Sequence, residues 1–554
     1  MEASDDTKSK GMRLPATVET PVHGAGVPTS RRLFLTTALA GAGVLAVRPQ
    51  GEPKWNPGMV RHLLPAVSHN RLRLKAGFDR PLTAVPLLRA GSRSAPGVRT
   101  DTAGEFYSFD IAGLEPERRY SLELLDSRGK PLCDPWPISI FPGPEAQPKR
   151  FRLLVYTCAG GHPATVNPDT GHPYWVSITN RRKMLLTGLS YQPDAVIAIG
   201  DHVYWDLRSP VGSTNLGNSP VARKLVGEFT RSEPIFGTDN ERKLKLVVTP
   251  QLRDLYGTIF RSTPVFFVQD DHDYFENDEA TEAMVTFPPD DFMLRLARAT
   301  QGLYYPEFLP DSGRPRGLPG SGAPDHVSES YGTLRYGKLL EIMMYDCRRG
   351  MTLKGPAAGF LPDTVEAWLM RRMAAQETHH IVNLPSTPVG WSAGKWGEWY
   401  PDLLQADGKL GTVKPKYFWQ PGWKSQHDRL LSAASAMTRI PLFLSGDLHA
   451  LAEGKIRRYG QLDFSRNPVV SVLTGPISTG PKAWPSAWRG TAPQTPTGLE
   501  NEEGLQPLEK NGFSVIDFTE DRIEGQFFSW KMGEPEERLD NLKPFHRFTL
   551  ERRL

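Results

Sequence analysis

Residues 196–206, VIAIGDHVYWD, pass from a short apolar run directly into a glycine, two carboxylates and a phenol. An uninterrupted apolar run of this length predicts a strand that is buried on both faces. Three other runs end in the same way: FRLLVYTC at Cys158, PVFFV before 270–273 (DDHD), and PLFLS before Gly446, Asp447 and His449. Because the carboxyl ends of parallel strands lie along one edge of a sheet, we expect the four clusters to meet in one crevice.

The side chains at these strand ends predict a metal centre. Five carboxylates would share a small crevice with His, Tyr and Cys, and like charges within about 4–6 Å raise each other's pKa unless cations neutralise them. Hard oxygen donors together with a phenolate and a thiolate suit a trivalent ion or a mixed metal pair better than a structural zinc. The spacings CxxC and HExxH, which are typical of zinc sites, do not occur.

The apolar pattern divides the chain into two folded regions after a leader. At 554 residues the chain is too long for a single core. Period-two alternation in LRLKA, FYSFDI, YSLEL and WPISIF predicts a small antiparallel β-sandwich over 55–145. From residue 150 to 554, short apolar runs alternate with amphipathic segments, which predicts an α/β domain. Within it we expect helices after Thr249, from Asp363 and after Ser425.

The N-terminal segment 1–50 has the features of an export signal. Residues 29–47, TSRRLFLTTALAGAGVLAV, place Arg31 and Arg32 before an uncharged apolar stretch shorter than the roughly 20 residues of a membrane span. This resembles a twin-arginine leader. We therefore expect the twin-arginine machinery to export the protein to the periplasm, cell wall or outside, without a transmembrane anchor in the mature form. That route carries folded proteins with their cofactors loaded, which favours a metalloprotein.

Charge and cysteine content exclude some classes of protein. The formal net charge of +4 is small for this length, so bulk charge would not draw in nucleic acid, and no specific nucleic-acid binding is expected. Three cysteines are too few for a disulfide framework. Whether Cys133 and Cys347 pair stays open.

Taken in order, the four clusters resemble the calcineurin-like metallophosphoesterase superfamily, and within it the PhoD-like alkaline phosphatases. The superfamily signature runs Asp-x-His, Gly-Asp-x-x-(His/Tyr), Gly-Asn-His-(Asp/Glu), a lone His and Gly-His-x-His. This chain has TCAGG, GDHVY, DDHDY and GDLH, and these departures are similar to the PhoD branch. Leu114, Pro116 and Tyr120 similarly resemble the tyrosine corner of fibronectin type III modules. The implied fold is a four-layer αββα sandwich preceded by a small all-β sandwich domain.

The resemblance also implies a dinuclear centre of Fe(III) and Ca(II), with other divalent metals possible. The implied ligands are Cys158, Asp201, Tyr204 and Asp447 for the ferric ion, with Asp201 bridging, and Asp271 and His449 for the second ion. His272 would meet the leaving-group oxygen and Asp273 would orient it.

The function expected on these grounds is hydrolysis of phosphate esters by a hydroxide activated between two metals, as in an alkaline phosphatase or phosphodiesterase. A phospholipase-like phosphodiesterase is one alternative, and an exported surface-binding protein with a vestigial metal domain is another. Arg348 and Arg349 end an apolar run and could clamp a phosphate or be solvated. The Trp-rich segment 388–424 could bind a substrate group or pack internally.

Overall fold

The computed structural model describes residues 55–166, 171–205, 227–275, 285–309, 314 and 330–552. The expected export signal at 29–47 and Asp206 lie outside these residues. In the described part, no helix combines the length and the hydropathy that a membrane crossing requires.

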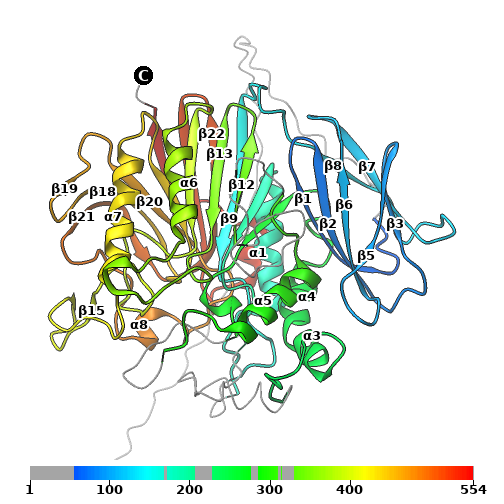
Figure 1. Cartoon of the computed structure of the whole chain (residues 1–554), viewed down its shortest axis with the longest axis horizontal. Helices are drawn as coiled ribbons and strands as arrows, with labels where there is room; N and C mark the ends of the chain where they lie inside the picture. Colours follow the sequence, from blue (N-terminus) through cyan, green and yellow to red (C-terminus); the bar gives the residue numbers. More distant parts are fainter. Residues whose placement is uncertain are drawn as a thin grey trace, which may run out of the picture. The chain divides into compact units, whose positions relative to one another are not determined.

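A small β-sandwich precedes the larger domain (Figure 1). Its antiparallel sheets have the strand orders β1-β2-β6-β5 and β4-β3-β7-β8. Phe109 and Ile111 on β6 are buried and alternate with the partly exposed Ser108 and Asp110, as period-two patterning requires. The strands are β1 Val60–Val67, β2 Arg71–Phe78, β3 Leu87–Ala90, β4 Arg93–Pro96, β5 Val98–Arg99, β6 Phe106–Ala112, β7 Arg119–Leu125 and β8 Trp136–Ser139.

The larger domain contains two main sheets. The first has the order β11-β10-β9-β22-β23-β24, and its β9, β10 and β11 are parallel. It consists of β9 Arg150–Thr157, β10 Ala195–Ile199, β11 Val265–Val268, β22 Asn511–Thr519, β23 Arg522–Trp530 and β24 His546–Glu551. The second has the order β12-β13-β14-β17-β20-β18-β19, with β21 on β18. It consists of β12 Tyr331–Tyr336, β13 Leu340–Tyr345, β14 His380–Pro385, β17 Leu442–Ser445, β18 Leu451–Tyr459, β19 Leu462–Asp463, β20 Val469–Thr474 and β21 Leu499–Leu508.

Several strands of each sheet, such as β10 and β11 in the first and β13, β14, β17 and β20 in the second, are buried on both faces, which explains the uninterrupted apolar runs. Leu153 and Val155 of β9 belong to the same apolar cluster as Ile342 of β13, between the sheets. The alternate residues Leu154 and Tyr156 join the cluster that contains the helices. The helices α6 and α7 lie against the second sheet in Figure 1. The order helix, sheet, sheet, helix confirms the predicted fold class.

The remaining elements complete the domain. The helices are α1 Ile178–Ser190, α3 Asp239–Gln251, α4 Arg253–Tyr256, α5 Asp291–Tyr304, α6 Asp363–Ala374, α7 Pro421–Ser435 and α8 Pro485–Trp488. Short elements are η1 Asp271–Asp273, η3 Gly355–Ala357, η4 Glu536–Asn541 and the β15 Leu403–Leu404 and β16 Leu410–Gly411 hairpin.

Two helices begin earlier than the sequence predicted. The N-cap of α3 is Thr238, whose side chain accepts a hydrogen bond from the Asn240 N–H, whereas Thr249 lies near the end of α3 and contacts the Tyr304 hydroxyl at 2.7 Å. Both threonines precede apolar residues at helical spacing, so local sequence could not decide between them. The helix expected after Ser425 begins at Pro421, and the helix expected from Asp363 begins there.

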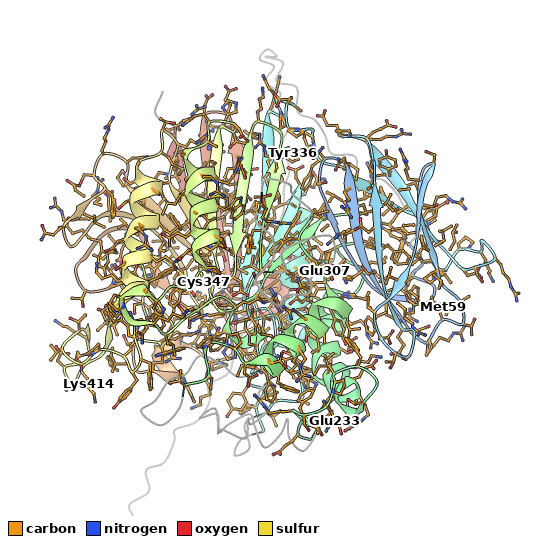
Figure 2. All side chains as sticks on the ribbon, viewed as in Figure 1. Met59, Glu233, Glu307, Tyr336, Cys347 and Lys414 are labelled. Atoms are coloured by element: carbon orange, nitrogen blue, oxygen red, sulfur yellow. The ribbon has the colours of Figure 1, made fainter. Side chains whose placement is uncertain are left out.

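Buried polar contacts join the sandwich to α5. Lys75 Nζ donates to the Gly302 carbonyl at 2.9 Å and pairs with Glu307 at 3.0 Å (Figure 2 labels Glu307). His62 is fully buried, and its Nε2 donates to the Tyr304 carbonyl at 2.5 Å. Burial lowers the pKa of His62 to about 4, so the ring is neutral in the folded protein at pH 7.

Acidification should therefore weaken the protein partly through His62. Because its pKa is lower in the folded state, its contribution is complete above the unfolded value of 6.5 and declines as the pH falls towards 4, by at most about 1.4 kcal/mol per pH unit. His62→Gln should lower the free energy of unfolding at pH 7, and its gap to wild type should narrow by pH 5. Urea unfolding at both pH values measures this gap. A constant gap for His62→Gln would contradict the assignment.

Candidate metal centre

The four polar clusters meet at one place, although they come from both sheets. β9, β10 and β11 end side by side in the first sheet, and β17 ends in the second. Thr157 joins the two groups, because its Oγ1 donates to the Ile199 carbonyl at 2.5 Å and accepts from the Asp447 N–H at 3.3 Å. The crevice therefore lies where the carboxyl ends of two facing sheets approach each other.

Four of the proposed ligands adopt a strained backbone. Cys158, Asp201, Asp447 and His449 have φ values of 49°, 56°, 66° and 49°, and they are four of the seven non-glycine residues with positive φ in the described chain. Such conformations cost of order 1–3 kcal/mol each and cluster at functional sites. The positive φ values let the backbone turn sharply after the strand and direct these side chains into the crevice.

Two glycines permit the close approach of these turns. A Cβ on Gly200 would lie 2.4 Å from the Asp270 Cβ, and one on Gly446 would lie 2.1 Å from Thr157 Oγ1. Both distances are below any van der Waals contact. The glycine before each aspartate of GDHVY and GDLH is therefore a steric requirement of the converging loops.

The first group of donors surrounds Asp201. Cys158 Sγ donates to Asp201 Oδ2 at 3.2 Å, and the Tyr204 hydroxyl donates to the same oxygen at 2.9 Å. His449 Nε2 lies 3.1 Å from the Tyr204 hydroxyl. Because His449 Nδ1 donates to the Ala483 carbonyl at 2.8 Å, its Nε2 electron pair points to the centre. Donor atoms of Cys158, Asp201 and His449 all lie within 4.8 Å of one another.

His449 thus joins the first group, whereas the resemblance implied it at the second position. Burial lowers the pKa of His449 to about 4, so its ring is neutral, the form that binds metals. Thiol, phenol, carboxylate and imidazole together form a donor set suited to a transition metal.

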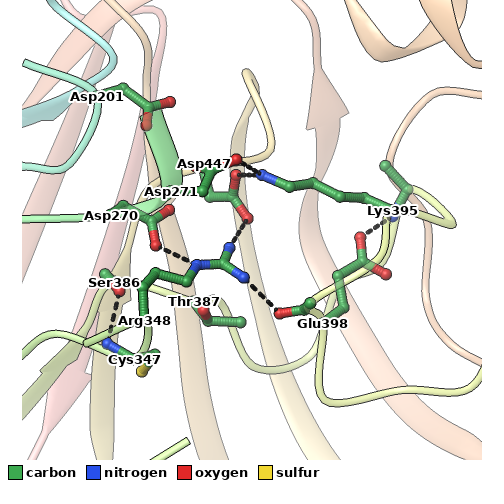
Figure 3. A network of polar contacts seen from close by, with 12 residues as sticks. Asp201, Asp270, Asp271, Cys347, Arg348, Ser386, Thr387, Lys395, Glu398 and Asp447 are labelled. Atoms are coloured by element: carbon green, nitrogen blue, oxygen red, sulfur yellow. Dashed lines mark hydrogen bonds and ion pairs between the residues drawn. The ribbon is translucent and has the colours of Figure 1, made fainter. Parts of the chain in front are cut away.

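The second group contains Asp270, Asp271 and Asp447, whose oxygens also lie within 4.8 Å of one another. Asp270 Oδ2 and Asp271 Oδ1 are buried without a hydrogen-bond partner. Buried carboxylate oxygens normally have partners, so these two fit a cation or a substrate group. However, Lys395 lies among them: its Nζ is 2.7 Å from Asp271 Oδ2 and contacts Asp447 Oδ1 (Figure 3).

The electrostatics differ between the two groups. Burial, together with the charges of Asp271 and Asp270, raises the pKa of Asp201 well above its ordinary value. Burial also raises the pKa values of Cys158 and Tyr204. A metal ligand must be deprotonated, so a cation bound to this group would offset these shifts. For Asp271, burial acts in the same direction, but Lys395, with His272 and Arg348, outweighs it and lowers the pKa well below the ordinary value.

The residues predicted for proton transfer have different environments. His272 is partly exposed, and its ring lies 4.2 Å from that of Tyr204. Asp273 is buried, and its carboxylate accepts the backbone N–H groups of His202, Val203 and Asp270 at 2.7, 3.1 and 3.0 Å. Both Asp273 oxygens therefore hold the two ligand loops together, a role that the prediction did not include.

Sequence reasoning missed Lys395 as part of the site, and it left Arg348 as either a phosphate clamp or a solvated residue. Arg348 is not solvated: it is completely buried, with Nε 2.7 Å from Asp270 Oδ1 and Nη2 3.3 Å from Asp447 Oδ2. Arg349 is also buried, with Nη2 donating to Gln269 Oε1 at 3.0 Å. The sequence around Arg348 gives no sign of these contacts, because its partners Asp270 and Asp447 are some 80 to 100 residues away in the chain.

Two open alternatives from the sequence are resolved by packing. Trp391, Trp399 and Trp423 are completely or almost completely buried, so the Trp-rich segment is packed internally. Cys133 and Cys347 are both free thiols in different apolar clusters, so they do not pair.

Comparison with known proteins agrees with this geometry. The family model for PhoD-like phosphatases matches residues 177–527. The chain belongs to this family. It is therefore a PhoD-like phosphatase. No curated protein sequence matches it.

Solved structures show the same fold. The structure of PhoD superposes with a TM-score of 0.60 at 14% identity, covering 90% of each chain. The purple acid phosphatase PPD1 from yellow lupin (Lupinus luteus) seeds gives a TM-score of 0.53 at 11% identity, covering 90% of this chain and 75% of that one. The β-sandwich followed by a two-sheet domain is thus an architecture found in other phosphatases.

The steric role of Gly446 in this PhoD-like phosphatase can be tested directly. Gly446→Ala places a methyl group on Thr157 Oγ1, which anchors two strand ends, so the melting temperature should fall by several degrees, as overpacking costs about 1–3 kcal/mol. Gly302→Ala is the matched control: it lies in α5 with open space around it and should be neutral or slightly stabilising. Equal melting temperatures for both variants would contradict the close approach.

Proposed function

We propose that this chain is a phosphoric ester hydrolase of the alkaline phosphatase or phosphodiesterase type, in which two cationic centres flank the scissile ester. The observation that carries the proposal is the convergence of Cys158, Asp201, Tyr204 and Asp447 from three strand ends and their loops, beside the partly exposed His272, which follows a fourth strand. In this arrangement, bound metal would lower the pKa of a water to supply the nucleophile and would neutralise phosphoryl oxygens.

The first cationic centre is a metal ion held by the group around Asp201. Cys158, Tyr204 and His449 contribute a thiolate, a phenolate and an imidazole, and the neighbouring carboxylates contribute oxygens. Such donors favour a trivalent transition metal, and the family resemblance implies Fe(III) here. The resemblance implies Ca(II) for the second centre, with Asp271 as a ligand, and the oxygens of Asp270 and Asp447 lie within 4.8 Å of that carboxylate.

The protein residues have separate tasks in the reaction. His272 donates a proton to the departing oxygen, because its ring is partly exposed beside Tyr204 and within 4.0 Å of Asp271. The attack needs no covalent phosphoenzyme, since the nucleophile is a hydroxide. Asp273 acts as a positioning residue, because it fixes the loops that carry Asp201 and Asp271.

We also propose export by the twin-arginine pathway to the periplasm, cell wall or extracellular space. Its support is the segment 29–47. The alternative of a surface-binding protein with a vestigial metal domain is disfavoured, because a decayed site would not keep a strained backbone at four donors. A phospholipase-like diesterase would use the same residues on a different ester.

Removal of Asp201 should abolish turnover. Asp201→Ala deletes the carboxylate on which the thiol and phenol converge, and activity on p-nitrophenyl phosphate and bis-p-nitrophenyl phosphate should be lost while expression is little changed. The two esters separate monoesterase from diesterase in the wild type. Asp463→Ala is the control, since this aspartate is exposed on β19. Full activity of Asp201→Ala would exclude the proposed centre.

His272 can be tested through the leaving group. A general acid contributes about 10²- to 10⁴-fold, and it matters most when the departing oxygen is basic. His272→Ala should therefore reduce kcat on an alkyl phosphate by about this factor, with a much smaller loss on p-nitrophenyl phosphate, whose product is a weak base. Equal losses on the two substrates would assign His272 to binding and not to proton transfer.

A further inference from the structure

A lysine of the chain lies among the carboxylates of the second group. Lys395 Nζ is 2.7 Å from Asp271 Oδ2 and hydrogen-bonds to Asp447 Oδ1, and its side chain is only 8% exposed (Figure 3). A second metal ion held by the group of Asp270, Asp271 and Asp447 would need these oxygens. A metal ion and an ammonium group cannot occupy the same position.

The surrounding segment holds Lys395 in place. Within 388–424, the Glu398 carboxylate accepts hydrogen bonds from the Ser392 hydroxyl at 2.5 Å and the Ala393 N–H at 2.8 Å, and it pairs with the buried Lys416. These contacts fix the chain on both sides of Lys395. The lysine is therefore not a mobile surface residue that happens to reach the site.

Backbone and aromatic packing add to this constraint. Gly394 and Gly397, with φ of 72° and 76°, allow the tight turns on either side of the Lys395–Trp396 pair. Trp396 and Trp399 are buried, and the Trp396 ring packs against Trp423 of α7 at 5.6 Å. The segment thus has an internal structure that presents one ammonium group to the crevice.

The distribution of charge matches this arrangement. Arg348 pairs with Asp270 and Asp447, and Lys395 pairs with Asp271 and Asp447. Each carboxylate of the second group therefore forms an ion pair with a basic side chain of the chain itself. Asp201 instead accepts hydrogen bonds from a thiol and a phenol, which are neutral donors. The group around Asp201, with its thiol, phenol and imidazole donors, therefore has no such Arg or Lys ion pair among the described residues.

We propose that the Lys395 ammonium takes the place of the second metal ion, so that each chain binds one metal ion, in the group around Asp201. This inference rests on the proposed function and replaces the calcium that the family resemblance implies. Lys395 then presents N–H donors to a phosphoryl oxygen on the side opposite the metal, as a compact point charge can. The unpartnered Asp271 Oδ1 and Asp270 Oδ2 lie beside this position.

Metal stoichiometry tests the proposal without reference to turnover. Purified wild-type protein should contain one transition metal ion per chain by plasma mass spectrometry and should bind no calcium in equilibrium dialysis. Lys395→Met removes the charge but keeps much of the side-chain volume, and it frees Asp271 and Asp447, so it should gain one bound calcium. Lys395→Arg keeps a cation there and should retain the wild-type stoichiometry.

Lys414→Met is the matched control, because Lys414 lies on the outside of the same segment (Figure 2) and should leave both metal counts unchanged. Two metal ions in the wild type would overturn the proposal. A folded Lys395→Met protein that binds no calcium would also overturn it. Should this variant fail to fold, the wild-type and Lys395→Arg counts decide the question.

Hydrolysis of p-nitrophenyl esters by the wild type is a separate measurement. The hydrolysis assay therefore tests the phosphatase function, and the metal count separately tests the role of Lys395. A protein that hydrolyses esters with two metals refutes only the role of Lys395. A protein with one metal and no hydrolysis of any phosphate ester refutes only the proposed function.

Discussion

Mutual repulsion among four buried carboxylates is the constraint around which this centre is built. Asp201, Asp270, Asp271 and Asp447 lie in one crevice away from water, where like charges cannot remain unneutralised. Arg348 and Lys395 neutralise part of this charge. In the proposed centre, a metal ion bound to the group around Asp201 would neutralise the rest.

The fold makes that crowding possible. Parallel strands in the first sheet bring three clusters to one edge, and the second sheet contributes the fourth through β17. Strained turns and glycines without room for a methyl group allow the loops to meet, and Thr157 ties the two edges. The apolar layers on either side of both sheets offset the strain, so the site depends on a core much larger than itself.

Much of this could be predicted from the sequence, because its signals are local. Buried strands read as continuous apolar runs, and Cys158, Asp201, Tyr204 and Asp447 follow such runs within a few residues. The contributions of distant segments could not be predicted. Lys395 reaches the crevice from a long insertion, and no spacing rule connects it to its carboxylate partners. The start of α3 was missed for a different reason, because two threonines were equally good caps.

The Trp-packed segment 388–424 carries its own buried ion pair, its own aromatic contacts and the lysine that enters the site. It lies between β14 and α7, outside the sheet strands that supply the donors around Asp201. Exchange of this one insertion during evolution could alter how many ions the scaffold needs while every sheet-borne ligand stayed the same. The requirement for a scarce metal would then depend on this loop and not on the sheets of the core.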